Sequence, residues 1–195
     1  MADILEPPQP SPRAIRWTRE DCAKLEEAGV LVGPYELIEG SINRMGQNMP
    51  HADFVMVILD WLVKLFGRKY VVTQASIDVR PEDNPTNEPM PDCLVLSRPA
   101  REFKERPRPE DIRLLVEVAD STLDYDLMTK SALYARAAIV EFWVVSVAEQ
   151  TIHVHRDPRE GRYQDISVLS GSDLIASLAA PTDAVEVGTL LSGDL

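Results

Sequence analysis

The stretch 112–119, IRLLVEVA, constrains the fold of this chain more than any other segment. It is short, apolar and β-branched, which is typical of a strand in the interior of a sheet. Its exception is Glu117. Burying an unpaired carboxylate is costly, and the usual remedies are a cation, a hydrogen-bond network or protonation. The segment therefore predicts a compensating partner elsewhere in the chain.

Side chains alternate along a strand, so this segment is expected to have two different faces. One face would carry Ile112, Leu114, Val116 and Val118, and the other would carry Arg113, Leu115, Glu117 and Ala119. Glu117 is therefore predicted to point away from the more uniformly apolar face.

The length and apolar content of the chain predict one globular domain. With 195 residues and 45% hydrophobic content, the chain can bury a sizeable core. Prolines at positions 7, 8, 10 and 12 indicate a disordered or loosely attached N-terminus over residues 1–16. The single domain is then expected to span residues 17–195.

The net charge, the N-terminal sequence and the absence of long apolar segments argue against several classes of protein. A net charge of -12 argues against a protein that coats nucleic acid by bulk attraction, so any nucleic-acid role must rest on a local site. The N-terminus lacks a signal-peptide pattern, and no segment approaches the roughly 20 apolar residues of a membrane span. Cys22 and Cys93 lack metal-ligand spacing and are expected to be reduced. We expect a cytoplasmic protein without a membrane role.

Periodicity and turn signals predict an alternation of helices and strands. In chain order we expect a helix at 18–28 opened by a capping box at Thr18, a hairpin turning at 39–40, a helix from 50 closed by Gly67, a strand at 70–79, irregular structure at 81–91, strands at 93–97 and 112–119, a helix at 124–138, and strands at 141–146, 151–156 and 163–169. This order predicts an α/β (α+β) fold, a mixed central sheet flanked by helices.

Asp92 is the candidate companion of Glu117, because it follows Pro91 at the entrance of the apolar strand 93–97. If the two strands are neighbours, both carboxylates can converge on one divalent ion. Hard cations such as Mg²⁺ prefer oxygen ligands and retain water, which can attack a phosphodiester. The pair therefore indicates a metal site for phosphodiester chemistry.

Lys130 is the lysine best placed to complete such a site. On a helix Asp126, Lys130 and Tyr134 are spaced by four residues and share one face. A helix packed beside the strand could therefore direct Lys130 at the two carboxylates. A positive charge there would stabilise the transition state or position the nucleophile.

Each of these residues also has an ordinary structural interpretation. A lone glutamate in a strand is most often half-exposed, and an aspartate after a proline is a common strand-start residue. Asp126 with Lys130 could be a simple helix ion pair worth about 0.3 to 0.5 kcal/mol. What favours a site is the combination of the elements.

An ordered series of motifs resembles a known family. The series consists of Tyr35-Glu36-Leu37-Ile38-Glu39-Gly40, His51, Pro91-Asp92, Glu117-Val118-Ala119, Ser121-Thr122, Asp126, Lys130, Tyr134 and Glu141-Phe142-Trp143-Val144-Val145. It is similar to the Uma2 family of endonucleases, within the PD-(D/E)XK, restriction-endonuclease-like superfamily. The resemblance covers about residues 17 to 170, and it is specific as a series although each motif alone is weak.

The resemblance implies a restriction-endonuclease-like mixed sheet flanked by helices. It also implies that Asp92 and Glu117 bind Mg²⁺ or Mn²⁺ and that Lys130 is the catalytic lysine. In the wider superfamily the lysine lies two residues after the acid on the same strand, where this chain has Ala119. The resemblance thus implies a lysine that has migrated to the following helix.

Four further residues receive supporting roles. Glu36 is expected to be a further acidic ligand or to hydrogen-bond the metal's water, with an ordinary strand residue as the alternative. His51 is expected to contact the substrate or the site, with a structural or exposed histidine as the alternative. Asp126 is expected to orient Lys130, and Tyr134 to pack beside it.

These observations favour a Mg²⁺-dependent endonuclease that hydrolyses phosphodiester bonds in DNA. The alternative is a non-catalytic binding or regulatory module that retains the nuclease fold, and a third interpretation gives the acids a structural role alone. Many nucleases of this fold work as dimers, so a homodimer is expected by analogy.

The acidic net charge leaves the source of DNA attraction open. One candidate is the segment joining the two acid-bearing strands, which carries Arg98, Arg101, Lys104, Arg106, Arg108 and Arg113. His153 and His155 share one strand face, but they have no third metal ligand nearby in the sequence.

Overall fold

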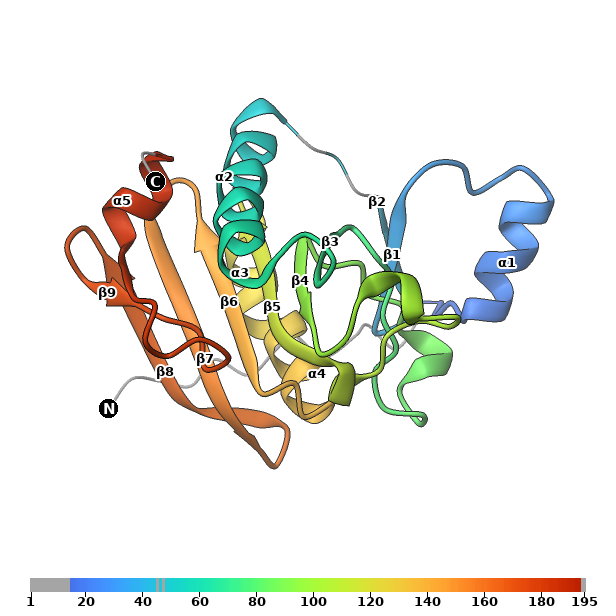
Figure 1. The fold of residues 1–195 in the computed structure, drawn as a ribbon. Helices are drawn as coiled ribbons and strands as arrows, with labels where there is room; N and C mark the ends of the chain where they lie inside the picture. Colours follow the sequence, from blue (N-terminus) through green and yellow to red (C-terminus); the bar gives the residue numbers. More distant parts are fainter. Residues whose placement is uncertain (1–14, 45, 47, 194–195) are drawn as a thin grey trace.

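A six-stranded mixed sheet forms the centre of the molecule. The computed structural model describes residues 15–44, 46 and 48–193. The strands, in chain order, are β3 (Val71–Thr73), β4 (Cys93–Leu96), β5 (Ile112–Ala119), β6 (Glu141–Ser146), β7 (Thr151–Arg159) and β8 (Arg162–Ser170). They lie side by side in this same order (Figure 1). Only β5 and β6 are parallel neighbours, so the predicted mixed sheet is confirmed.

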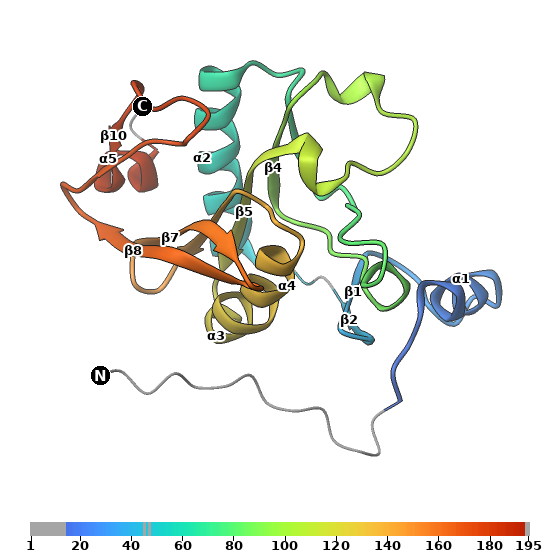
Figure 2. The ribbon, with the colours of Figure 1, turned by 90° about the horizontal axis from the view of Figure 1, so that it is seen from below.

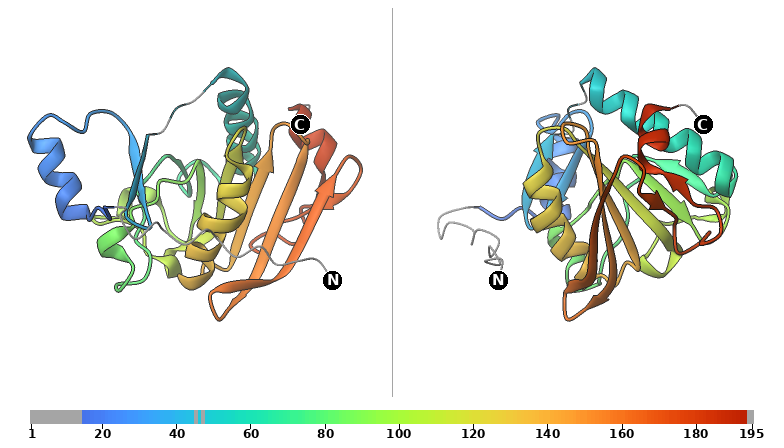
Figure 3. Two further views of the ribbon diagram at one scale, coloured as in Figure 1. Left: turned by 180° about the vertical axis from the view of Figure 1, so that it is seen from behind. Right: turned by 90° about the vertical axis from the view of Figure 1, so that its left-hand side faces the viewer.

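Helices cover both faces of the sheet, as expected for a restriction-endonuclease-like fold. A parallel pair needs a crossover, and a helix spanning residues 123–136 supplies it between β5 and β6. α2 (Met49–Phe66) and α5 (Val187–Ser192) lie on the opposite face. Figure 3 shows the sheet between these two helical layers. The crossover therefore places one helix directly over the face to which Glu117 belongs.

α2 begins and ends where its sequence signals predict, within one residue. The side chain of Asn48 accepts the backbone N–H of His51 at 3.0 Å, and Pro50 fits the first turn. Gly67 ends the helix with a φ of 87°, a conformation that glycine adopts readily. Its apolar stripe packs on the sheet, where Trp61 stacks on Trp143 with ring centroids 5.8 Å apart.

A β-bulge corrects the predicted alternation of β5. Val95 of β4 pairs with Leu114, but the next residue, Leu96, pairs with Ile112. Arg113 is thus the extra residue of the bulge, so Ile112 turns to the other face and packs in the same cluster as Leu115. The prediction that Ile112 shares a face with Leu114 is wrong, whereas Glu117 keeps its predicted face.

β1 (Tyr35–Ile38) and β2 (Ser41–Arg44) form a separate two-stranded hairpin beside the main sheet. As predicted, it turns at Glu39 and Gly40, which have φ angles of 50° and 77°. Positive φ at both central residues matches the twist of a two-residue hairpin. Figure 2 shows the hairpin next to α1 (Arg19–Glu27) and far from β8. The capping box predicted at Thr18 is confirmed, with Asp21 as its partner.

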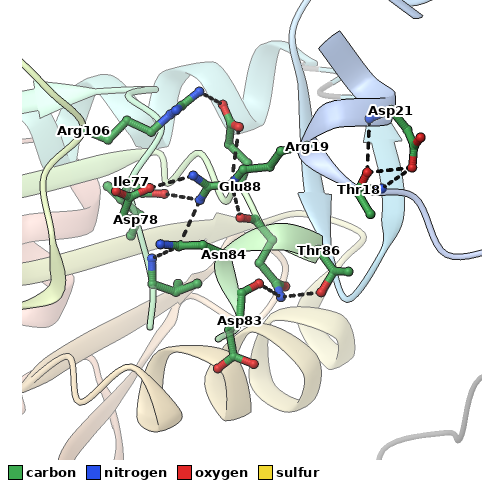
Figure 4. A network of polar contacts seen from close by, with 12 residues as sticks. Thr18, Arg19, Asp21, Ile77, Asp78, Asp83, Asn84, Thr86, Glu88 and Arg106 are labelled. Atoms are coloured by element: carbon green, nitrogen blue, oxygen red, sulfur yellow. Dashed lines mark hydrogen bonds and ion pairs between the residues drawn. The ribbon is translucent and has the colours of Figure 1, made fainter. Parts of the chain in front are cut away.

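A polar network centred on Arg19 attaches α1 to the segment 77–88, and Figure 4 shows its contacts. Arg19 donates to Asp78 Oδ1 and to the carbonyl of Asn87, both at 2.7 Å. The buried Asn87 side chain in turn accepts the backbone N–H of Glu39 at 2.7 Å. A backbone bridge between Leu37 and Glu88 completes the attachment. These contacts fix the position of β1.

Two predictions between 70 and 91 need correction. The predicted strand 70–79 is regular only over Val71–Thr73. The segment facing its continuation contains Pro89 and Pro91, which have no N–H to donate to the ladder. Residues 74 and 77 still donate to the carbonyls of these prolines, but the pairing is irregular. The segment 81–91, predicted to be irregular throughout, contains a short 3-10 helix at Asn84–Thr86.

The predicted helix at 124–138 forms over residues 123–136, but it is not a uniform α-helix. Its middle turn, Asp126–Lys130, is π-helical, between the short α-helical segments α3 (Leu123–Tyr125) and α4 (Ser131–Arg136). Single π-helical turns of this kind often lie at functional sites. Here the turn carries two of the predicted site residues, both buried.

Some features of the chain lie outside the sequence predictions or the described residues. β9 (Leu174–Ile175) and β10 (Val185–Glu186) form a small additional sheet that was not predicted. The flexible N-terminus expected at 1–16 lies mostly outside the described residues. Within those residues no helix has the length and apolarity to cross a membrane. Cys22 and Cys93 are buried free thiols, as expected.

Candidate active site

A pocket of about 450 Å³ opens beside the ends of β4 and β5. Its walls come from the β1–β2 hairpin, the first turn of α2 and the helix 123–136. Of the residues predicted for the site, Glu36, His51, Asp92, Glu117, Asp126 and Lys130 line this pocket. Tyr134 lies behind it, fully buried. Residues from five separate elements are thus brought together as a single cluster.

Asp92 and Glu117 lie on neighbouring strands, the arrangement on which the two-carboxylate hypothesis depends. Cys93 pairs with Val116 in an antiparallel ladder, so Asp92 lies opposite Glu117. Both carboxylates are 3% exposed. The backbone N–H of Val118 donates to Asp92 Oδ2 at 2.8 Å, which holds that carboxylate at the end of the sheet.

Lys130 reaches the acidic cluster from the helix. Its Nζ lies 3.0 Å from Glu36 Oε2, 3.1 Å from Glu117 Oε1 and 3.5 Å from Asp126 Oδ1. Residue Lys130 is 6% exposed, so these ion pairs are shielded from water. The π-helical turn sets the angle at which the lysine leaves the helix, because it displaces the side chains of that turn relative to an α-helix.

The carboxyl groups of the cluster outnumber Lys130, and burial raises the pKa values of three of them. Burial raises the pKa of Glu117 well above its ordinary value, against the opposing effect of Lys130, and the neighbouring acids raise it further. Burial also raises the pKa values of Glu36 and Asp126 in spite of Lys130. Burial alone would lower the pKa of Lys130, but attraction from the carboxylates outweighs it and raises the pKa well above its ordinary value. Lys130 is therefore protonated, and one cation is shared among several acids.

Two hydroxyl groups orient the acids. The Tyr134 hydroxyl donates to Glu117 Oε1 at 2.7 Å, so the tyrosine holds the glutamate itself as well as packing near Lys130. The Thr122 hydroxyl donates to Asp126 Oδ2 at 2.7 Å. Thr122 was noted in the motif series without a role, and its position four residues before Asp126 is the signal that identifies it.

His51 lies against Asp92 rather than in solvent. Its Nε2 is 3.3 Å from Asp92 Oδ2, and this hydrogen bond raises the pKa of the imidazole against the effect of burial. Its Nδ1 is buried and has no hydrogen-bond partner within the described part of the chain. The histidine thus adds a second polar contact to the carboxylate that begins β4.

The sequence predictions missed one wall of the pocket. Asn43 and Arg44 of β2 line it, and Asn43 donates to the hydroxyl of Tyr125 on the facing helix at 2.9 Å. Nothing in the local sequence marks these residues. They reach the pocket because the hairpin folds over it, which is a long-range arrangement.

The basic segment expected to attract DNA is not part of this pocket. It connects the ends of β4 and β5 that lie opposite Asp92 and Glu117. Several of its arginines are paired with acids, namely Arg98 with Asp111 at 3.7 Å, Arg106 with Glu88 at 2.5 Å and Arg108 with Glu105 at 3.6 Å. The segment therefore does not contribute to the pocket, and its attraction of DNA stays a prediction.

The histidines of β7 also lie apart from the pocket. His155 is buried against Tyr163 and Phe142, and its Nδ1 is 3.3 Å from the Ser131 hydroxyl. Burial lowers its pKa to about 4, so the ring is neutral at pH 7. His153 interacts with Glu149, which precedes β7 in the chain. Neither histidine lines the acidic pocket.

The donor set of the pocket fits a hard divalent cation. Across the described ranges no group of three or more His, Cys, Asp or Glu residues is arranged as a complete metal site. Mg²⁺ is commonly held by one or two carboxylates, with water and substrate oxygens completing its shell. Asp92 and Glu117 supply two such carboxylates, and the excess of acid over Lys130 leaves negative charge to be compensated. The residues present are therefore compatible with Mg²⁺ or Mn²⁺.

Comparison with known proteins places the chain in a family. Residues 33–187 match the model of the Uma2 family, described as "Putative restriction endonuclease". A crystal structure of a putative nuclease belonging to DUF820 from Anabaena variabilis superposes with a TM-score of 0.64 at 16% sequence identity. The alignment covers 88% of this chain and 98% of that chain, and it supports the restriction-endonuclease-like fold. No curated protein matches the sequence. Since the family model covers most of the chain, the protein belongs to the Uma2 family.

Proposed function

We propose that the protein is a metal-dependent endonuclease that hydrolyses phosphodiester bonds in DNA. The observation that carries this proposal is the convergence of Asp92, Glu117 and Lys130 in one pocket, from two neighbouring strands and a crossover helix. Membership of a family described as restriction endonucleases supports the same reaction class.

Asp92 and Glu117 are the proposed ligands of Mg²⁺ or Mn²⁺. When bound, the cation supplies a Lewis acid for the phosphoryl oxygen and lowers the pKa of water for attack on phosphorus. Val118 N–H and His51 hold Asp92, and the Tyr134 hydroxyl holds Glu117. Glu36 is buried at the edge of the same pocket, where its Oε2 pairs with Lys130 Nζ at 3.0 Å, so it is the candidate for a further acidic contact.

Lys130 is the proposed stabiliser of charge in the transition state. It remains protonated because several carboxylates surround it, and its ammonium lies 3.1 Å from Glu117. A phosphate that enters the pocket would therefore meet a fixed positive charge, which is most effective where water is excluded. Asp126, held by Thr122, positions the lysine.

The proposal includes three more specific expectations. The nucleic acid is DNA, the compartment is the cytoplasm, and the active form is a homodimer. The dimer rests on analogy with other nucleases of the fold.

Cleavage of single-stranded, double-stranded and branched DNA with Mn²⁺ or Mg²⁺ tests the proposal. We expect the wild type to cleave at least one of these forms, and losses of about 10² to 10³-fold for Asp92→Asn, Glu117→Gln and Lys130→Ala. Asp165→Asn, an exposed change on β8, is the matched control and should cleave normally. Calorimetric titration with Mn²⁺ should show binding that both acid variants lose. Metal binding without cleavage of single-stranded, double-stranded or branched DNA would contradict the proposal.

The ion pairs of Lys130 favour a second candidate, a binding module that keeps the nuclease fold without catalysis. Its ammonium partly compensates the acids without any metal. In that case the three substitutions would leave the biological function intact, and Mn²⁺ would not bind. A function lost in all three variants would exclude this candidate.

A further inference from the structure

Arg44 is a cation at the mouth of the pocket that forms no ion pair within the described residues. Among the described residues, Lys130 and Arg44 are the lysine and arginine side chains that line it. Lys130 is occupied by three carboxylates at the floor. Arg44 is exposed, and no carboxylate in the described part of the chain pairs with it. Its charge is available to a ligand that approaches the acids.

The hairpin that carries Arg44 is fixed at one end and faces the pocket at the other. At the turn, the Arg136 guanidinium pairs with Glu39, and Gly40 N–H donates to the carbonyl of Thr86 at 2.8 Å. At the far end, β2 places Asn43 against Tyr125 of the helix. Arg44 therefore projects from a supported strand, so its position at the pocket mouth is defined by the fold.

Burial of the reactive groups limits what can reach them. Asp92 and Glu117 are 3% exposed and Lys130 is 6% exposed, at the floor of a pocket of about 450 Å³. A phosphodiester must therefore enter the pocket to be cleaved. A DNA duplex is stiff, with a persistence length of about 50 nm, and presents its phosphates on a regular surface. A single strand can bend one phosphodiester inward.

The charge of the pocket also favours a single strand over a duplex. The pocket carries the carboxylates of Glu36, Asp92, Glu117 and Asp126, in a chain of net charge -12. A duplex brings one negative charge per about 1.7 Å of its axis, and a single strand brings about half that density. With Arg44 as the available cation, the mouth can neutralise about one phosphate. The aromatic ring of Tyr125 also lines the pocket, and aromatic rings are common stacking surfaces for unpaired bases.

We propose that the pocket takes single-stranded DNA and that Arg44 binds the phosphate next to the scissile one. This inference rests on the proposed nuclease function of the same pocket. It adds a substrate class and a residue that positions the substrate, neither of which follows from the roles of the three central residues.

Binding of a fluorescent oligonucleotide, followed by anisotropy in Ca²⁺ with its integrity checked on a denaturing gel, tests the inference. The wild type should bind the single strand at least about 10-fold more tightly than a duplex of the same sequence. Arg44→Ala should weaken single-strand binding about 10-fold and reduce the slope of log K against log salt by about 0.7, the value for one phosphate. Arg44→Lys should keep most of the slope.

Arg162→Ala is the matched control. Arg162 is also exposed and unpaired among the described residues, but it lies at the start of β8 and does not line the pocket. It removes the same charge and should leave affinity and slope unchanged. Thermal unfolding of both variants should match the wild type, because neither arginine has an ion-pair partner to lose.

The outcomes separate this inference from the proposed function. Equal or tighter binding of the duplex, or equal effects of Arg44→Ala and Arg162→Ala, would overturn the inference even if plasmid DNA is cleaved. Single-strand binding that depends on Arg44 would support it even if no DNA is cleaved, and the nuclease proposal would then fail alone.

Discussion

Glu117 and Glu141 are both buried glutamates on adjacent parallel strands, yet their surroundings differ completely. Glu141 is 0% exposed and accepts five hydrogen bonds, from Arg156 twice, Trp143, the Ser177 hydroxyl and the backbone of Leu178. Glu117 accepts one from Tyr134 and shares Lys130 with other acids. A structural carboxylate is saturated by donors, whereas the one in the pocket lies in an excess of negative charge.

This contrast distinguishes two uses of a buried acid. Glu141 joins the start of β6 to Ser177 and Leu178, and its partner Arg156 donates to the carbonyl of Ala176, so these hydrogen bonds hold the C-terminal part of the chain. Glu117 is held in position, but it shares its cation, Lys130, with Glu36 and Asp126, and its pKa is raised by burial. The first arrangement stabilises the fold, and the second fits the further cation that we propose. Substitutions at the two positions should therefore have opposite effects on stability.

The largest effect is expected for Glu141→Gln. The substitution breaks the ion pair with Arg156 and places amide hydrogens against several donors, so the free energy of unfolding should fall by about 3 kcal/mol. Urea denaturation at pH 7 measures it. The control is Asp157→Asn, which removes the exposed pair with Arg159 and should cost under about 0.5 kcal/mol. A loss at Glu141 as small as the control would remove the distinction between the two glutamates.

Lys130→Met should have an effect of about the same size. It leaves Glu36, Glu117 and Asp126 buried without their cation, so we expect a loss of about 3 kcal/mol at pH 7. The loss should shrink at pH 5, because burial has raised the pKa values of these carboxyls and they take up protons there.

Lys64→Met is the control for that experiment, because Lys64 is exposed on α2. Its effect should stay within about 0.5 kcal/mol and should not vary with pH. A loss in Lys130→Met that is the same at pH 5 and pH 7 would mean that the carboxyls do not titrate as their burial requires.

Tyr134→Phe removes one donor from Glu117 and keeps the aromatic packing on Phe142. The free energy of unfolding should fall by about 1 kcal/mol, the net value of one hydrogen bond. Cleavage should fall as well, since the glutamate loses its orientation. The two measurements together are informative, because a purely structural tyrosine would change the stability and leave the activity per folded molecule intact.

An effect of opposite sign, no larger than that of Tyr134→Phe, is expected for Glu117→Gln without metal. A buried carboxyl with a raised pKa binds more protons in the folded than in the unfolded state between its ordinary pKa of 4.5 and its raised one. Stability of the wild type is therefore lost as pH rises through this window. The substitution removes that loss, so at pH 7 the variant should be more stable by about 1 kcal/mol.

Urea denaturation from pH 4.5 upward, in a chelator, measures the difference between the two proteins. His51, whose pKa is also raised, contributes a loss of stability of the same sign, but it is present in both and cancels. A difference that stays constant with pH would show that Glu117 does not titrate in this range. Excess Mn²⁺ should reverse the order, because the wild type alone keeps both proposed ligands.

Local sequence patterns predicted the helices and strands well where the apolar residues followed a clear helical or strand periodicity. The apolar stripe of α2 and the capping box at Thr18 depend on neighbours within a few residues, so the sequence was sufficient. The prediction for 70–79 was wrong because the length of that strand depends on prolines in a different segment. The bulge at Arg113 escaped prediction for the same reason, since it is a property of two paired strands.

The sequence by itself determined that Glu117 had to find a partner, because a carboxylate within an apolar strand is too costly to leave alone. It also gave the order of motifs that identifies the family, including the lysine on the helix. Only the tertiary structure decided which groups meet. It placed Lys130 among Glu36, Glu117 and Asp126, and it brought Arg44 to the pocket mouth. The physical reason is that these contacts join residues far apart in the chain, and no local sequence pattern determines which distant residues come close in space.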